Sequence, residues 1–273
     1  MKFWGNGYGQ TLGDQLATNR PVYTAGVTWF VNSAVGTDAG GSAGQDPEKP
    51  LATLGQAVAN ATAADVVILQ DGHTETLTAA LAINKQLFIA GGGLSGSVPT
   101  VNFTVNAANQ DAFNITAAGT EIRNVWFKES AQSNAGSGGG KVHVAQSGVR
   151  LIGCYFSMGA SDQLAGVLSD SVAPNNMRIE SCTFISTATS RATRPTQGLS
   201  IRQSASDVEI YNCIFSDGAV GFSGTAFDTS VSTQTRLRMV NISLLLGATM
   251  NHAGTTTGFL AGLTSTGGPK VNW

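Results

Sequence analysis

A six-residue pattern recurs five times in the second half of the chain, and its spacing constrains the fold more than any other feature. The copies begin at Ile122, Leu151, Ile179, Ile210 and Met239, which are 29, 28, 31 and 29 residues apart. In nearly every copy the first, fourth and sixth residues are apolar. A regular period of this length indicates a solenoid, in which each repeat forms one coil and stacked coils bury a shared core.

Each copy predicts a short strand, a bend and a second strand. Alternating apolar and polar residues are typical of strands, and the third residue is of a type that tolerates a sharp bend or left-handed backbone. The third residues are Asn124, Gly153, Ser181, Asn212 and Asn241. Stacking of the copies predicts two interior columns. The first column contains Val125, Cys154, Cys182, Cys213 and Ile242, and the second contains Phe127, Phe156, Phe184, Phe215 and Leu244.

Other segments complete the coils. A second group of strands is expected at 113–115, 142–144, 167–168 and 199–201, and weaker coils at 65–69 and 87–93. The segment from Leu51 to Ala61 has apolar residues at helical spacing after Pro50, and we expect it to cover the open end of the sheet. The sequence therefore predicts an all-β, single-stranded parallel β-helix over residues 28–245. An N-terminal arm (1–27), a capping helix (near 51–61) and a C-terminal tail (246–273) accompany it.

The entry to the repeat resembles the right-handed parallel β-helix proteins grouped as pectin-lyase-like. Strand, Gly-rich loop, cap helix and first coil follow one another in Phe30–Ser33, Gly36–Asp38, Asp46–Leu54, Ala57 and Asp65–Val67. The resemblance implies a right-handed solenoid. That fold hosts polysaccharide lyases, glycoside hydrolases, phage tailspikes and non-catalytic virion proteins, so it implies no single function.

The catalytic patterns of that family do not transfer to this chain. Pectate lyases of the family use clustered Asp ligands for calcium with an Arg or Lys base. Its polygalacturonase-like hydrolases use an adjacent Asp pair and a Gly-His-Gly segment. Here no two Asp residues are adjacent, and His143 lies between Val142 and Val144. We therefore expect no catalytic residue, no metal site and no cofactor.

Composition excludes several classes of function. Charged residues make up 12% of the chain and the formal net charge is -2, so no basic face is available for nucleic acid. The longest apolar runs are too short to span a membrane. The three cysteines match neither a disulfide framework nor a zinc-ligand spacing. The first residues lack the apolar segment of a secretory signal peptide, so we expect synthesis in a host cytoplasm.

Two outward columns are candidates for surface contacts. The residues that precede the first strand position form a column in which three of the four neighbouring pairs are of opposite charge. This column predicts a surface charge ladder, in which each pair contributes little. The column contains Glu121, Arg150, Arg178, Glu209 and Arg238. The fifth position of the copies holds Trp126, Tyr155, Thr183, Ile214 and Ser243. Because Trp126, Tyr155 and Ile214 would leave an apolar stripe in water, this column indicates a subunit interface, or alternatively a groove in which sugars stack.

Loop and terminal residues supply the remaining candidates. Four loop acids either converge on a saccharide site or cap turns: Asp162, Asp170, Asp217 and Asp228. Arg191 and Arg194 either contact a sugar acid or a neighbouring subunit, or lie in solvent. His73, after Asp71 and Gly72, is expected in a turn. The terminal segments carry aromatic residues suited to binding another protein surface: Phe3, Trp4, Tyr8 and Trp273.

Taken together, these features favour a non-enzymatic phage virion structural protein. We expect a homotrimer that decorates or cements the capsid, or forms a short head fibre. Its partners would be other virion proteins, such as the major capsid protein or tail components, with no nucleic acid and no membrane. The alternatives are a tailspike-like protein that binds or degrades polysaccharide, and a carbohydrate-binding adhesin without catalysis. Two carboxyls at hydrolase distance in an open cleft would indicate the enzyme.

Overall fold

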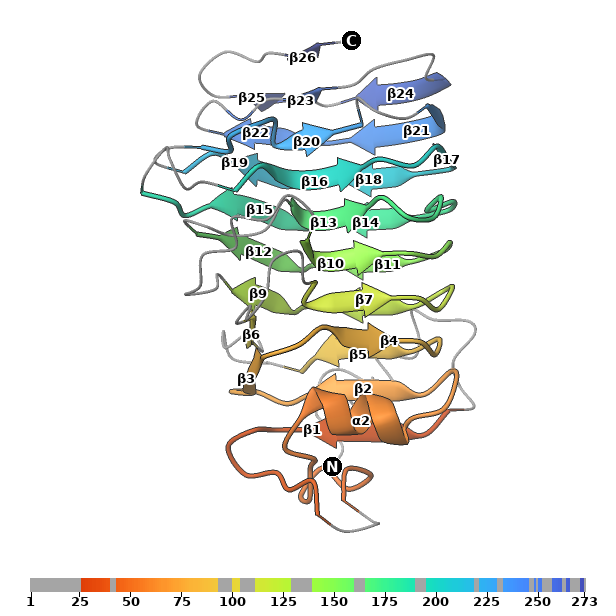
Figure 1. The fold of residues 1–273 in the computed structure, drawn as a ribbon, viewed down its shortest axis with the longest axis vertical. Coiled ribbons are helices and arrows are strands. Elements are labelled where there is room, and N and C mark those ends of the chain that lie inside the picture. Colours follow the sequence, from red (N-terminus) through yellow and green to blue (C-terminus); the bar gives the residue numbers. More distant parts are fainter. Residues whose placement is uncertain are drawn as a thin grey trace, which may run out of the picture.

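Three parallel sheets stack the coils into a column, with the N-terminal coils at one end and the C-terminal coils at the other (Figure 1). The computed structural model describes residues 26–39, 43–92, 111–128, 139–159, 165–189, 195–218, 221–229, 233–245 and 248. It also describes the backbone of 100–103, 250–251, 257–261, 264–265 and 271–272. Strand pairs in these ranges are parallel, as a solenoid requires.

The sheets are named A, B and C. Sheet A contains β1 (Thr28–Val31), β2 (Val66–Leu69), β5 (Phe88–Gly91), β8 (Glu121–Arg123), β11 (Arg150–Ile152), β14 (Arg178–Glu180), β17 (Ala205–Ser206), β18 (Glu209–Tyr211), β21 (Gln234–Val240) and β24 (Thr257–Ala261). Sheet B contains β3 (Thr74–Leu77), β6 (Thr100–Phe103), β9 (Trp126–Lys128), β12 (Tyr155–Met158), β15 (Thr183–Ser186), β19 (Ile214–Ser216), β22 (Ser243–Leu245) and β25 (Thr264–Ser265). Sheet C contains β4 (Leu81–Ile83), β7 (Phe113–Ile115), β10 (Gly140–Val144), β13 (Ala165–Ser169), β16 (Gln197–Ile201), β20 (Phe227–Asp228), β23 (Met250–Asn251) and β26 (Val271–Asn272).

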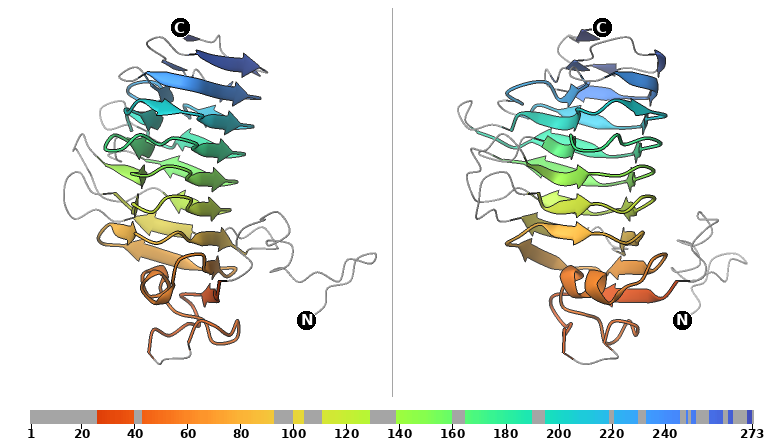
Figure 2. Two further views of the ribbon diagram at one scale, coloured as in Figure 1. Left: turned by 90° about the vertical axis from the view of Figure 1, so that its right-hand side faces the viewer. Right: turned by 45° about the vertical axis from the view of Figure 1, so that its right-hand side comes forward.

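Each coil of the repeat passes through sheet C, then sheet A, then sheet B, and the two further views show the same stacking (Figure 2). The corner between sheets A and B is short: Asn124 and Val125 alone separate β8 from β9. The connection from sheet B back to sheet C is longer and varies in length. The expected strand–bend–strand unit is therefore confirmed, with sheet C supplying the second group of strands.

Left-handed backbone produces the corner, as the Asn, Gly and Ser residues predicted. Asn124, Gly153, Ser181, Asn212 and Asn241 have φ angles of 52°, 63°, 53°, 52° and 54°. A second left-handed column, which the sequence analysis did not identify, lies two residues before the members of the charge ladder. It contains Gly119, Gly148, Asn176, Asp207 and Arg236. Arginine rarely adopts left-handed backbone. The Arg236 guanidinium pairs with the Asp207 carboxylate one coil away (Nε–Oδ1 2.5 Å).

The two predicted interior columns are confirmed. Four phenylalanine rings stack face to face at centroid distances of 4.9, 4.8 and 4.9 Å, which match the spacing between paired strands. These rings are Phe127, Phe156, Phe184 and Phe215, and each is at most 1% exposed. The cysteine column is buried to the same degree. Because no coil fills its interior alone, the stack itself is the core.

A short helix, α2 (Leu54–Asn60), covers the N-terminal end of the column (Figure 1). It begins three residues later than the sequence predicted, because Leu51 forms a β-bridge with Val31. Thr53 is the N-cap, and the Glu75 carboxylate accepts the Leu54 N–H at 2.7 Å. Leu54, Ala57 and Val58 face the core, so the helix closes it as expected.

Two side chains fix this capped end further. Lys85 Nζ donates to three carbonyl oxygens at the C-terminal end of α2, those of Val58, Ala59 and Ala61 (3.0, 3.0 and 2.7 Å). His73 is buried in the turn before β3, where its Nδ1 accepts the Ser33 N–H at 3.1 Å. His73 is therefore a structural turn residue, as expected.

Strand pairing continues beyond residue 245, where the sequence analysis placed the start of a tail. β24 pairs with β21 in sheet A, β25 with β22 in sheet B, and β23 and β26 extend sheet C. The parallel ladder thus includes backbone segments of the expected tail.

Candidate functional site

The outer face of sheet B carries the predicted apolar stripe. Strand register places Trp126, Tyr155, Thr183, Ile214 and Ser243 in one column. The Trp126 and Tyr155 rings meet edge to face at 5.4 Å, and Trp126 Nε1 donates to Ser157 Oγ at 3.1 Å. Both rings are half-buried, whereas Ile214 is 37% exposed. The stripe is thus real but only partly open to solvent in the single chain.

The outer face of sheet C holds a polar cluster that the sequence analysis missed. His143, the fourth residue of β10, lies between two carboxylates: its Nδ1 is 3.0 Å from Asp111 Oδ2 and its Nε2 is 2.9 Å from Asp170 Oδ1. Ser171 Oγ lies 3.3 Å from the same Nε2. Asp111 precedes β7, and Asp170 and Ser171 follow β13, so the cluster spans three adjacent coils.

Burial and charge set the protonation of this cluster. The hydrogen bond that His143 Nδ1 donates to Asp111 raises the pKa of His143, burial opposes that shift, and the charges of both carboxylates add to it. The His143 side chain is 13% exposed, against 15% for Asp111 and 32% for Asp170. The other oxygen of Asp111 accepts the Gly140 N–H at 2.9 Å, which fixes that carboxylate. The cluster therefore favours an imidazolium held between two carboxylates.

The sequence indicated the orientation of His143 but not the positions of its partners. Alternation along 142–144 places His143 outward, since Val142 and Val144 face the core. Its partners, however, occupy different positions of their own coils. Asp111 stands two residues before its strand and Asp170 one residue after, so no column alignment brings them together.

The four loop acids do not converge. Asp170 joins His143, but Asp217 accepts the Phe222 N–H with Oδ1 at 3.5 Å and caps its own turn. Asp228 is buried and accepts from Gln197 Nε2. Leu168 and Ser200 separate Asp228 from His143 along the outer column. Asp162, Arg191 and Arg194 lie outside the described residues, as do Phe3, Trp4, Tyr8 and Trp273.

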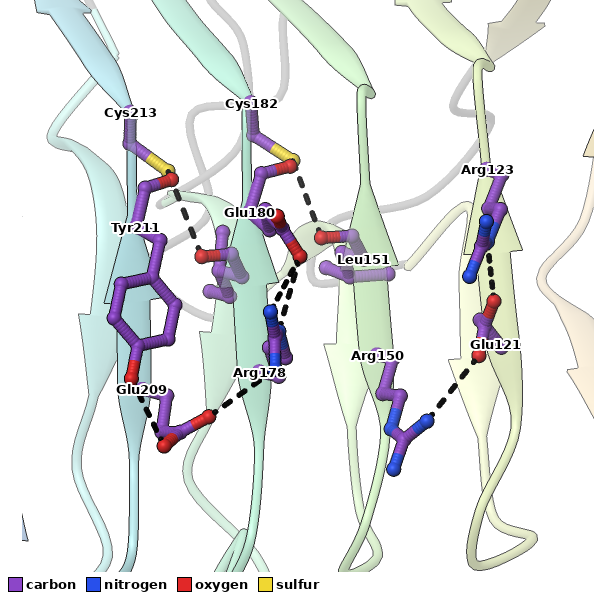
Figure 3. A network of polar contacts seen from close by, with 11 residues as sticks. Glu121, Arg123, Arg150, Leu151, Arg178, Glu180, Cys182, Glu209, Tyr211 and Cys213 are labelled. Atoms are coloured by element: carbon purple, nitrogen blue, oxygen red, sulfur yellow. Dashed lines mark hydrogen bonds and ion pairs between the residues drawn. The ribbon is translucent and has the colours of Figure 1, made fainter. Parts of the chain in front are cut away.

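The predicted charge ladder lies on the outer face of sheet A (Figure 3). Arg150 is 3.7 Å from Glu121, and Arg178 is 3.5 Å from Glu209. One part of the expectation was wrong: Glu121 is not on the surface, since its side chain is 2% exposed. It pairs with Arg123, which also stacks over the buried Phe88 ring, so this end of the ladder is part of the packing.

The three thiols are structural. Each Sγ donates to a carbonyl of the preceding coil, as Cys182 does to Leu151 at 3.4 Å (Figure 3). Burial raises the pKa of the Cys213 thiol to about 12. A protonated, buried thiol such as that of Cys213 is a poor nucleophile, and the burial of all three side chains agrees with the expected core role. In the part of the chain that the structure describes, no three His, Cys, Asp or Glu side chains group as metal ligands, and no helix is long and apolar enough to span a membrane.

Comparisons with known proteins give only distant likeness. No family model matches the chain, and no curated protein matches it. The solved structures that resemble it include pectate lyase Pel9A, with 11% identity over 89% of this chain and 78% of that chain and a TM-score of 0.48. The pectin methylesterase from Aspergillus niger has 14% identity over 88% and 85% of the two chains, with a TM-score of 0.45. Geobacillus virus E2 ORF18 has 12% identity over 76% and 52%, with a TM-score of 0.35.

The fold rests on the structure itself and not on these likenesses. The parallel pairing of three sheets, the stacked interior columns and the left-handed corners define the fold independently of any relative. The chain is a right-handed parallel β-helix of three sheets, since parallel strands joined by crossovers wind in this hand.

Proposed function

We propose that this protein is a structural component of a phage virion, which assembles side by side, as a homotrimer, through the outer face of sheet B. The observation that carries the proposal is the column of Trp126, Tyr155 and Ile214 on the outside of the solenoid. The interior is already filled by the phenylalanine and cysteine columns, so the core does not need these side chains. Trp126 and Tyr155 lie on successive coils, and Ile214 follows two coils later, after Thr183. Apolar side chains aligned in one column favour association with a second apolar surface.

The test of assembly is the sedimentation of the full chain. Trp126→Ser and Ile214→Ser should each shift the protein towards the monomer without loss of strand content, since neither side chain supports the core. Tyr211→Ser is the matched control, because Tyr211 is an aromatic residue of the outer face of sheet A. An unchanged oligomer in the two sheet B variants, or dissociation in the control, would refute the sheet B interface.

Membership of a virion needs its own test. Phage particles whose genome encodes the chain are purified and analysed by mass spectrometry. The protein should be present at a stoichiometry that fits a repeated component of a shell or fibre. Antibody labelling in electron micrographs then distinguishes the proposed capsid position from a tailspike position. Absence from intact particles would refute the virion role.

The second candidate is a tailspike-like protein that binds or cleaves polysaccharide, and the Asp111–His143–Asp170 cluster is the observation that favours it. The geometry disfavours a glycosidase, however. Such enzymes need two carboxyls on either side of the glycosidic bond, and here the imidazole of His143 occupies the space between them. Release of reducing ends from a panel of host-surface polysaccharides, abolished by Asp170→Asn, would establish this candidate in place of the first.

A further inference from the structure

The cluster on sheet C has a second feature, which neither the structural role nor saccharide cleavage uses. A hydroxyl, an imidazole and a carboxylate follow one another in hydrogen-bonding order. Ser171 Oγ is 3.3 Å from His143 Nε2, and His143 Nδ1 is 3.0 Å from Asp111 Oδ2. Ser171 is exposed, His143 is largely covered, and Asp111 is anchored by the Gly140 N–H. This is the order of nucleophile, base and orienting group that activates a serine, and such sites are recognised by geometry, not by fold.

We propose that Ser171, His143 and Asp111 form a serine ester-hydrolase site on the outer face of sheet C. Ser171 Oγ attacks the carbonyl carbon of a carboxylic ester while its proton passes to Nε2 of neutral His143. His143 then returns that proton to the departing alcohol, which leaves an acyl group on Ser171. Water, deprotonated by His143, attacks this acyl ester, and the carboxylic acid departs as the proton returns to Ser171. Asp111 is the positioning residue, which keeps the Nδ1 proton in place throughout.

Asp170 controls whether the base is free. In the structure its Oδ1 lies closer to Nε2 than the Ser171 hydroxyl does, at 2.9 against 3.3 Å. While His143 is protonated, Nε2 carries a hydrogen towards Asp170 and cannot accept one from Ser171. Among the described residues Asp111 and Asp170 are the charged groups in contact with His143, and Asn114 and Leu168 flank it on the neighbouring strands. Loss of the proton turns Nε2 into an acceptor, so the site becomes active as the pH rises.

The surroundings of Ser171 indicate the class of substrate. Ser171 and Val172 are both exposed, and Val172 is 41% accessible, so the hydroxyl lies on an open face. In the part of the chain that the structure describes, the N–H groups of these two residues donate to no acceptor, which leaves them available to an oxyanion. A nucleophile on an open face suits a short acyl group, such as an acetyl ester, displayed on the surface of a larger molecule.

The experiment measures hydrolysis of p-nitrophenyl acetate by the full chain between about pH 6 and about pH 9, with mass-spectrometric mapping of fluorophosphonate labelling. The rate should rise with pH through the pKa of His143, and the label should lie on Ser171. Ser171→Ala should lower the rate by about 100-fold and abolish labelling, and His143→Ala should match it. Ser223→Ala, at an exposed serine between β19 and β20, is the matched control and should change neither.

Two further variants separate the proposal from simpler explanations. Asp170→Asn should raise the rate at neutral pH and lower the pKa of His143 measured by NMR, because the competing carboxylate is gone. Asp111→Asn should also lower that pKa but reduce the rate, since the ring loses its orientation. If Ser171→Ala keeps the rate while His143→Ala loses it, the imidazole acts alone and the proposal is overturned. Absence of both label and hydrolysis in the Asp170→Asn variant also overturns it, and leaves the proposed assembly through sheet B unaffected.

Discussion

The inside and the outside of the same coils follow different rules. Between β9 and β19 the interior repeats one ring at every level, from Phe127 to Phe215, with nearly constant spacing. Over the same coils the outer column of sheet C changes at each step, through Asn114, His143, Leu168, Ser200 and Asp228. The interior must match its neighbours because each ring packs on the ring below, whereas the outer column varies in both chemistry and burial: Leu168 and Ser200 are buried and His143 is partly exposed. The polar cluster around His143 therefore lies in a column whose residues do not repeat.

The largest expected effect belongs to the interior. Phe184→Ala removes a ring that is fully buried and stacked on both sides, so the free energy of unfolding should fall by about 3–5 kcal/mol. Urea denaturation followed by circular dichroism measures the change. A loss below about 1 kcal/mol would mean that the column does not carry the core.

The next effect lies on the outer face of sheet A, where one column contains both a buried and an exposed carboxylate. Glu121→Gln should cost about 1–3 kcal/mol, because Arg123 loses a charged partner that is 2% exposed. Glu209→Gln, at the matching position and 36% exposed, should cost less than about 1 kcal/mol. Equal losses in the two variants would show that burial does not distinguish the two ends of the ladder.

A smaller effect is expected at the corners. Ser181→Gly should stabilise the protein by about 0.5 kcal/mol, since glycine adopts the left-handed backbone that serine adopts only with strain. The reverse change at the equivalent corner, Gly153→Ala, should destabilise by at least about 1 kcal/mol, because the new Cβ would lie 2.4 Å from Asn124 Oδ1. Thermal unfolding of both variants tests whether the two corners are equivalent.

The smallest effect concerns the pH dependence of stability at the sheet C cluster. Because the pKa of His143 is raised in the folded chain, its contribution is fully present below the unfolded pKa of about 6.5 and disappears as the pH rises through the folded pKa. Stability should therefore decrease slightly over that range in the wild type. The decrease should be weaker in Asp111→Asn, which removes the main cause of the shift. A flat profile in the wild type would show that the two carboxylates do not bind the imidazolium.

Sequence reasoning was successful where position within the repeat decides the contact. The phenylalanine and cysteine columns, the charged column and the corner residues all join equivalent positions of successive coils, and a constant period makes such partners evident. The reasoning failed where contacts run diagonally. Asp111, His143 and Ser171 occupy three different positions of three coils, so only the lengths of the loops and the twist of the strands bring them together. It also missed the burial of Glu121, because Phe88 below it is not part of the recognisable repeat.

The three buried cysteines can report local opening of the solenoid. Cys154, Cys182 and Cys213 occupy three consecutive turns, and a maleimide in solvent reaches none of them while the turns remain closed. Alkylation therefore measures how often each turn opens. The order in which the three sulfurs become modified would show from which end the solenoid unfolds.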